Sequence, residues 1–465
     1  DYEELLGDVT TNRDAVAGER KIKSKKMLYL PPLPSMTCGI NYDDNGNVHI
    51  ITGSHLTEEG RASYKKYLSL AYFYGATGRT VDGLTGLIFS KNPIKELQPA
   101  ISYLDKNVDG QGSSLRRQAQ KAAREAFITP RSGLLVDFPD VPGSVSIAQA
   151  EQSNLRPKIV HYPFESIFNW HYSTVNNETK LTLLVLMETV EVLKDDFTVE
   201  EVVKYRVLRI QEGVYTQQLY NDDGNPESEP VVVMVNGQPA NEIPFYEIAT
   251  GIEGKSIIND LVDANLNHYR FFADYAAKEH ASAFPVFTET GVSGDDQNVI
   301  IGPGAKWTNI SPEAQFGILQ TASDGGSMRT YLQDMEERMA ALGAEMLKPR
   351  ISGAESAEAK SLDQVAQNST TADLAITVSE AYMKAINFAA RWMNAPEENI
   401  FELNTDYNPQ HMNPQMFTAL MAALQNGNIS YQTFYENLQR GEIANPERTQ
   451  EDEQALIQSS ELGLE

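Results

Sequence analysis

Alternating apolar and polar residues predict strands in the first half of the chain, and apolar residues at helical spacing predict helices around them. Asp44-Asn45-Gly46-Asn47 is typical of a hairpin turn, and Thr57 is placed to cap a helix. The elements expected up to residue 256 are a hairpin at Cys38–Tyr42 and Val48–Thr52, helices from Thr57 through Tyr72 and over 113–129, a buried strand over 133–139, and strands over 180–192, 202–211, 215–220 and 231–235.

The second half of the chain changes character and is dominated by long helical periods. Residues 257–283 and 326–347 predict two amphipathic helices, separated by a short insert with strand-like segments at 284–288 and 316–319. Pro349 and Gly353 stop the second helix, and a polar stretch to Thr370 is expected to form a loop. Beyond it the pattern predicts a helix through Leu374, Val378, Ile386 and Trp392, a strand at Phe401–Leu403, helices at Pro414–Leu424 and Tyr431–Arg440, and an acidic tail.

Two segments resemble ligand-binding loops, but each lacks residues that such a loop requires. Glycines at positions 75, 78, 83 and 86 suggest a phosphate loop, but neither a following Gly-Lys-Ser/Thr nor a preceding buried strand is present. We interpret them as allowing close helix packing or a hinge. Asn41, Asp43 and Asn45 alternate as in a calcium loop, yet Thr52 stands where that loop needs a bidentate glutamate.

The net charge and the cysteine content limit the classes of protein to which this chain can belong. The net charge is −26, the opposite of that expected for a free-standing DNA-binding domain. This acidity is either ordinary solubility or a surface that meets DNA without holding it. The single Cys38 allows neither an internal disulfide nor a cysteine-based zinc site. Arg20–Lys26 is a basic cluster, either a solvated linker or an arm that reaches a neighbour or nucleic acid.

Patterns of catalytic chemistry are weak throughout. The seven histidines form no i, i+4 metal pair, and no Gly-x-Ser-x-Gly elbow is present. Asp137 and Asp140 could serve as a glycosidase-like acid–base pair, but only three tryptophans exist to line a sugar cleft. We therefore expect no catalytic, cofactor-binding or metal-binding residue, and a protein that is not an enzyme.

Several stretches, taken in order, carry a resemblance to a known family. They are Gly78–Phe89, Gly133–Pro139, Asp260–Tyr275, Ile301–Trp307 and Glu336–Ala344. Together with the series helix, β-containing insert, helix, polar loop, helix, they resemble the portal proteins of tailed double-stranded DNA bacteriophages. The resemblance covers about residues 60–400 and contains no catalytic motif.

The resemblance implies an α+β portal fold assembled as a ring, usually of twelve subunits. Its parts would be an N-terminal arm and hairpin (1–55), a wing (56–256), stem helices (257–283 and 326–347), a clip (284–325), a tunnel loop (348–371), a wing helix and strand (372–410), and crown helices with an acidic tail (411–465). Such a ring sits at one capsid vertex of the virion, after assembly in the host cytoplasm, and acts in DNA packaging and ejection.

Partners and site residues follow from the same resemblance. The clip would dock the terminase large subunit and later the head–tail adaptor or tail proteins, with Pro285, Val286, Phe287, Thr288, Asp295, Asp296, Val299 and Ile300 as docking residues. Lys348, Arg350 and Lys360 would face DNA passing through the channel without sequence specificity, or else they only meet a helix dipole and solvent. Capsid and scaffolding proteins would surround the ring, and no membrane is involved. The alternatives are another phage ring or adaptor protein, or an acidic-residue hydrolase.

Overall fold

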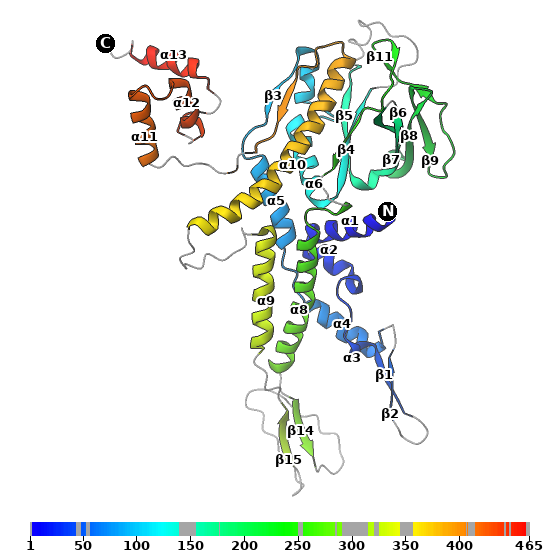
Figure 1. Cartoon of the computed structure of the whole chain (residues 1–465). Helices are drawn as coiled ribbons and strands as arrows, with labels where there is room; N and C mark the ends of the chain where they lie inside the picture. Colours follow the sequence, from blue (N-terminus) through cyan, green and yellow to red (C-terminus); the bar gives the residue numbers. More distant parts are fainter. Residues whose placement is uncertain are drawn as a thin grey trace.

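The chain folds into mixed helix and sheet, which confirms the α+β class (Figure 1). A computed structural model describes residues 2–42, 48–52, 56–138, 155–175, 177–249, 254–283, 286–290, 315–319, 325–344, 357–405, 407, 414–440, 443–445 and 448–461.

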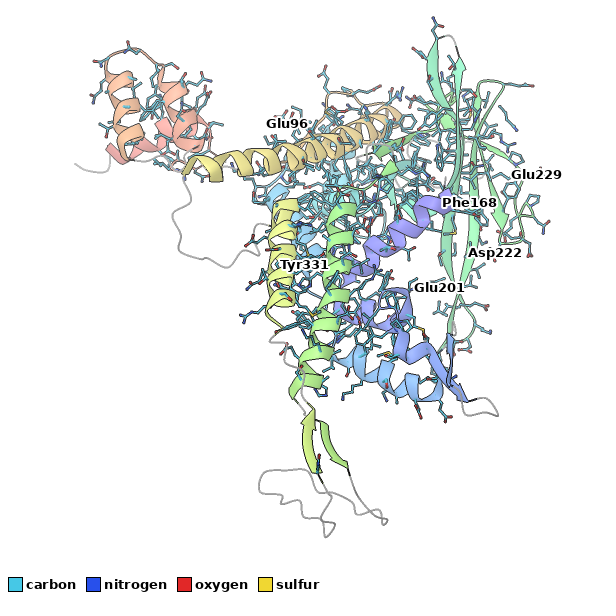
Figure 2. All side chains as sticks on the ribbon, turned by 60° about the horizontal axis from the view of Figure 1, so that its bottom comes forward. Glu96, Phe168, Glu201, Asp222, Glu229 and Tyr331 are labelled. Carbon is cyan, nitrogen blue, oxygen red and sulfur yellow. The ribbon has the colours of Figure 1, made fainter. Side chains whose placement is uncertain are left out.

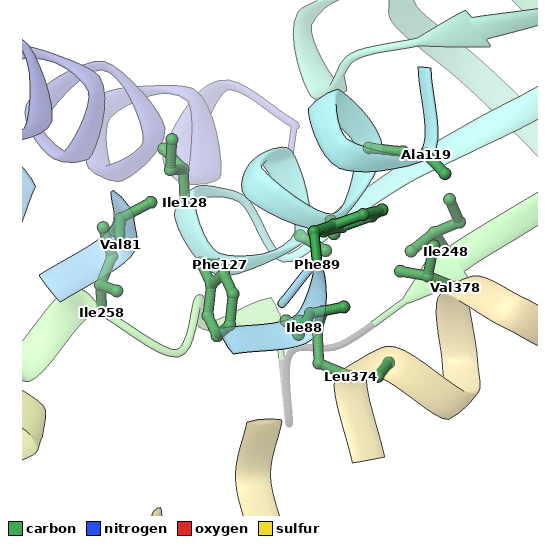
Figure 3. Packing of buried hydrophobic residues seen from close by; sticks show 14 of the residues in the cluster. Val81, Ile88, Phe89, Ala119, Phe127, Ile128, Ile248, Ile258, Leu374 and Val378 are labelled. Atoms are coloured by element: carbon green, nitrogen blue, oxygen red, sulfur yellow. The ribbon is translucent and has the colours of Figure 1, made fainter. Parts of the chain in front are cut away.

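The main core lies around a three-stranded antiparallel sheet in the order β13-β4-β5 (Phe245–Ala249, Arg131–Asp137, Lys158–Tyr162). α6 (Leu115–Ile128) and α10 (Ala357–Trp392) pack on this sheet through small alanine faces that let the backbones approach. Tyr382 on α10 donates to Gln118 Oε1 on α6 at 3.0 Å, and Gln118 in turn donates to the Ile159 carbonyl at 2.8 Å. Figure 3 shows apolar side chains of α5, α6, β13 and α10 meeting in this core.

A second, five-stranded antiparallel sheet stands beside the first, in the order β10-β9-β8-β7-β6. Its strands are β6 (Ile167–Val175), β7 (Glu178–Leu193), β8 (Val199–Gln211), β9 (Val214–Asn221) and β10 (Val231–Val232). Leu184, Leu186 and Leu208 bury one face against Leu135 of β4. The far ends of β7 and β8 extend beyond this core as an exposed two-stranded ribbon.

The N-terminal segment packs into the body, which corrects the expectation of a solvated linker or a reaching arm at Arg20–Lys26. α1 (Tyr2–Ala17) lies against α5 (Ala76–Ile88), α6 and α8, and the basic cluster forms α2 (Glu19–Ser24), with Ile22 fully buried. Asn12 donates to the Ile128 carbonyl at 3.0 Å. A Cβ on Gly78 would come within 2.7 Å of the Val16 carbonyl, so close packing at this glycine is confirmed. The basic residues predict an exposed segment, but the apolar Ile22 among them is buried and fixes the segment to the body.

Shorter elements fill the space between these layers. Thr57 caps α4 (Glu58–Leu70) by accepting a hydrogen bond from Gly60 N at 2.9 Å, as expected. This helix ends at Leu70, and a non-helical segment separates it from α5. The hairpin β1–β2 (Cys38–Tyr42 and Val48–Thr52) is confirmed in register, with Cys38 opposite Thr52. The remaining short elements here are η1 (Lys26–Leu28), α3 (Pro34–Thr37), η2 (Pro99–Asp105), η3 (Phe164–Ser166), the two-stranded pair β16–β3 (Ile400–Glu402 and Ile94–Glu96) and the pair β11–β12 (Met234–Val235 and Gln238–Pro239).

The polar stretch expected as a loop over 348–371 is partly helical, which is a second correction. α10 already runs from Ala357, so residues 357–371 continue into the helix that the apolar pattern placed only from Leu374 onward. Ala, Glu, Lys, Leu and Gln in this stretch are strong helix formers, and their propensity outweighs their lack of an apolar face. Residues 348–356 lie outside the described residues.

The end of the chain forms a separate group of helices, α11 (Pro414–Gln425), α12 (Tyr431–Arg440) and α13 (Gln450–Glu461) (Figure 1). The first two were predicted. The acidic tail expected after them forms α13 over most of its length. Its start is a capping box, in which Thr449 Oγ1 accepts from Asp452 N at 3.2 Å and the Asp452 carboxylate accepts from Thr449.

Candidate functional site

Two helices leave the body side by side and carry a small hairpin at their far end (Figure 1). α8 (Asn259–Ala283) and α9 (Gly326–Met339) correspond to the two amphipathic helices expected from the sequence. Between them, β14 (Val286–Thr290) pairs antiparallel with β15 (Gln315–Leu319), so that Val286 faces Leu319. This projection is the most distinctive feature of the chain and the natural candidate for its function.

An aromatic contact joins the two projecting helices. The rings of Phe271 on α8 and Tyr331 on α9 are 4.7 Å apart between centroids, although each residue remains about two-fifths exposed at 41% (Figure 2 labels Tyr331). At the far end, Gly325 starts α9 with a φ of 65°, and a Cβ there would lie 2.1 Å from Glu279 Oε1. A residue with a side chain cannot make this turn without displacing Glu279 of α8.

The base of the projection contains a buried polar cluster. His268 on α8 is 1% exposed, and its Nε2 lies 3.4 Å from Oε1 of Glu336 on α9. Burial lowers the pKa of His268 below its ordinary value, while the Glu336 carboxylate opposes that shift. One helical turn away, Asn265 Nδ2 donates to Thr77 Oγ1 of α5 at 2.9 Å. The cluster therefore ties both projecting helices to α5.

α9 ends at this base in a wider π-helical turn, Ala340–Ala344. Gly343 has a φ of 122°, a conformation that favours glycine, and a Cβ there would lie 3.6 Å from Thr80 of α5. Met339 is buried with Leu261 of α8 and Ala76 of α5. π-turns interrupt regular helices and recur at functional positions. Here the turn marks where the projection meets the body.

The N-terminal segment braces α8 from the other side. Arg270 Nε donates to the Tyr29 carbonyl at 3.0 Å, and Tyr67 of α4 donates to Asp274 Oδ1 at 2.5 Å. Burial and the neighbouring Asp274 carboxylate raise the pKa of Tyr67, so its hydroxyl stays protonated and remains a donor. The direction of α8 is thus set by contacts from three parts of the chain.

The predicted DNA-facing residues are not brought together by any described contact. Lys348 and Arg350 lie outside the described residues, and Lys360 belongs to the first turn of α10. Among the predicted docking residues, Val286, Phe287 and Thr288 lie in β14 at the end of the projection. Pro285, Asp295, Asp296, Val299 and Ile300 lie outside the described residues. Both sets remain predictions.

The acid–base pair considered for a hydrolase does not have a catalytic environment at its described member. Asp137 is 8% exposed and accepts from Arg206 Nη1 at 3.3 Å, with Lys158 Nζ 3.2 Å away. Arg206 also contacts Glu188 at 2.9 Å. Asp137 therefore belongs to an ion-pair cluster linking the two sheets, and Asp140 lies outside the described residues.

A comparable cluster was missed from the sequence. Arg13 on α1 donates to Glu125 on α6 at 2.5 Å and to Glu165 in η3. Burial would lower the pKa of Arg13, but its hydrogen bonds to Glu165 and Glu125 outweigh burial and hold the pKa above its ordinary value. No local sequence signal joins positions 13, 125 and 165, because the folded chain alone brings them together.

Sites for small ligands are sparse in the parts of the chain that the structure describes. Within those parts, no group of three or more His, Cys, Asp or Glu side chains is arranged to hold a metal ion.

No described helix combines the length and apolarity that crossing a membrane requires. A groove of about 570 Å³ lies between the start of α8 and α10, where Lys255, Asp260 and Asp373 place both signs of charge.

Comparison with known proteins adds a family and two structures. The model of a family described as a domain of unknown function, DUF4055, matches residues 258–393. The neck of a native GTA particle, computed with C12 symmetry, is similar at 12% identity, covering 80% of this chain and 92% of that chain with a TM-score of 0.39. The neck of an empty GTA particle, computed with C6 symmetry, is similar at 10% identity, covering 82% and 93%, also with a TM-score of 0.39. Similarity of this degree does not establish a shared fold. No curated protein matches the chain.

Proposed function

We propose that this chain is the subunit of a ring-shaped portal, the head–tail connector of a tailed double-stranded DNA bacteriophage. The observation that carries the proposal is the projection itself, in which α8 and α9 run side by side from the body and hold β14–β15 at their end. This arrangement supports the order stem, clip, stem that the sequence resemblance implies. The family match begins one residue before α8 and ends one residue after α10, so the sequence similarity spans these helices and the hairpin.

The shape of the isolated chain supports assembly with neighbours. The projection, the β7–β8 ribbon and the C-terminal helices stand away from the core and leave much of their surface uncovered (Figure 1). Copies arranged head to tail around an axis would cover part of this surface, because repeated heterologous contacts close into rings.

Charge suits a conduit that does not grip DNA. Twelve copies at −26 each would carry roughly −310, and whatever part of this charge lines the channel repels the duplex. Bound phosphates would release counterions and produce a salt-dependent affinity that opposes sliding. In this proposal, Lys348, Arg350 and Lys360 are the few cations that steady DNA, and the β14–β15 end docks the packaging terminase and later the tail adaptors.

End-on electron microscopy of the purified chain, combined with light scattering, tests the proposal. We expect closed rings with a central hole and a mass many times 51.6 kDa. A chain that stays monomeric at micromolar and higher concentrations in several salts contradicts the proposal. A shorter phage adaptor would lack the paired projecting helices, so rings in which α8–α9 is not resolved as a stalk count against the portal assignment.

A further inference from the structure

The tip of the β7–β8 ribbon exposes apolar and acidic side chains that its own chain leaves uncovered. Phe197 is 96% exposed and Leu193 is 77% exposed, and Val199 lies opposite Leu193 in register. Residues 189–201, which we call the ribbon tip, contain five acidic residues and one lysine, a net charge of −4. Exposed apolar residues gathered at one point with a charged rim are typical of a contact surface.

The ribbon tip is built as a firm support for Phe197. The Asp195 carboxylate accepts from the backbone N–H groups of Phe197 and Thr198, each at 2.8 Å. The turn closes with Lys194 N donating to the Thr198 carbonyl at 3.0 Å. A turn with these three hydrogen bonds holds Phe197 in one place, so an aromatic side chain is presented to solvent at low entropic cost to a partner.

Glu191 and Glu201 make the ribbon tip unfavourable while it stands alone. They face each other across the strands on the same face as Leu193 and Val199 (Figure 2 labels Glu201). Like charges directly opposite in an antiparallel pair are destabilising, and an isolated two-stranded ribbon is marginal in water. A partner with cations beside an apolar patch would relieve the repulsion and cover the apolar pair.

The same chain carries a surface of that chemistry elsewhere. Residues 19–28, which we call the basic ledge, contain five Lys or Arg residues and one glutamate, a net charge of +4. Within the chain, Lys23 pairs with Glu19 at 2.9 Å, and Lys21 and Lys25 each approach Asp14 at 3.9 Å, so the positive charge exceeds these carboxylates. The basic ledge ends in Met27, 47% exposed, and Leu28, 62% exposed. Lys26, the first residue of η1, has a φ of 51°, a conformation rare for residues with side chains, and this bend separates the buried Ile22 from the exposed pair.

We propose that the ribbon tip of one copy docks on the basic ledge of the neighbouring copy. The two surfaces carry charges of similar size and opposite sign, −4 against +4, and each places exposed apolar residues beside its charged ones. The contact joins two different surfaces, so it is heterologous and propagates around a ring instead of ending at a dimer. This inference rests on the proposed ring and names the surfaces that join its subunits.

Charge reversal with a matched control tests the contact. Glu200→Lys with Glu201→Lys should raise the concentration at which the chain assembles by on the order of tenfold or more, because like charges then face each other. Asp222→Lys with Asp223→Lys makes the same change in net charge at an exposed turn of the same sheet and should leave assembly unchanged. Adding Arg20→Glu and Lys26→Glu, two exposed residues of the basic ledge, to the first variant should restore assembly. Circular dichroism of each variant confirms folding.

Cross-linking provides a second readout that does not depend on charge. In a Cys38→Ser background, chains carrying Phe197→Cys mixed with chains carrying Leu28→Cys should give covalent dimers with a short thiol cross-linker. A chain with both changes should give a ladder up to the full ring, and either single change alone should give none.

The outcomes separate this inference from the portal proposal. Rings that form normally in the Glu200→Lys, Glu201→Lys variant, with no cross-link between positions 197 and 28, overturn the contact and leave the portal proposal standing. Cross-linking of Phe197→Cys chains to one another shows an isologous contact and also overturns it. A wild-type chain that never assembles overturns both.

Discussion

The imidazole Nε2 of His268 on α8 lies 3.4 Å from Oε1 of Glu336 on α9, at the level where both helices meet the start of α5. Rings of Tyr74 and Phe272 flank the imidazole, with centroids 5.6 and 6.2 Å away. A largely desolvated histidine joins two helices that otherwise pack through apolar and aromatic side chains. Its protonation state therefore bears on how firmly the projection is attached to the body.

Acid should loosen this attachment. Because burial lowers the pKa of His268, an unfolded chain binds a proton that the folded chain does not, so stability is lost as pH falls through the ordinary histidine value of about 6.5. We expect the midpoint temperature of thermal unfolding to decrease as the pH is lowered from 7 to 5, and to decrease less in His268→Gln. In Glu336→Gln the decrease should be larger, because the carboxylate that opposes the lowered pKa of His268 is gone. His171→Gln, on the exposed β6, serves as the control, and an equal flattening there contradicts the assignment.

Gly325 should not tolerate a side chain. Its φ of 65° and the approach of Glu279 Oε1 predict that Gly325→Ala destabilises the chain by about 1–2 kcal/mol. Gly86→Ala is the matched control, since Gly86 is an exposed helical residue with open space around its Cβ position, and it should stabilise by about 0.5–1 kcal/mol. Denaturant unfolding measures both. Equal effects at the two glycines count against a strained turn at the start of α9.

The ion pairs of Arg13 should contribute more to the free energy of unfolding than a surface ion pair does. Arg13→Ala leaves Glu125, only 8% exposed, without its cation and should cost about 2–3 kcal/mol. Arg124→Ala removes the partner of Asp82, which is 65% exposed at its side chain, and should cost at most about 1 kcal/mol. If deletion of residues 1–18 leaves the unfolding midpoint unchanged, the N-terminal segment is an arm after all.

The three cations expected in the channel should act on DNA and not on assembly. Changing Lys348, Arg350 and Lys360 to Gln should leave ring formation and thermal stability intact while altering packaging yield or DNA retention. Arg61, Lys65 and Lys66, exposed on α4, give a triple Gln control with the same loss of charge. Lost assembly in the first variant would make those residues structural, and the DNA-facing assignment would be wrong.

Docking of the motor should depend on the end of the projection. Replacing residues 291–297 with a short Gly/Ser linker should spare ring formation and impair terminase binding, because edge strands near this end are natural pairing sites. Pull-down of the terminase large subunit and a packaging assay measure the effect. Normal packaging by this variant would contradict the assignment of docking to the end of the projection.

Local patterns in the sequence predicted most elements correctly. The hairpin at 38–52, the paired helices α8 and α9 and the helices α11 and α12 follow from turn residues and apolar periods, which act over a few neighbouring positions. The polar composition of residues 348–371 predicted a loop, but the helix-forming residues among them start α10 already at Ala357.

Tertiary structure decided which distant residues meet. The ion pairs of Arg13 with Glu125 and Glu165, and of Asp137 with Arg206, join positions 40 or more residues apart, and a sequence pattern carries no distance information of that range. The same holds for exposure. Phe197 and Leu28 are apolar residue types that usually lie in a core, and only the fold, in which no described element covers them, places them at the surface.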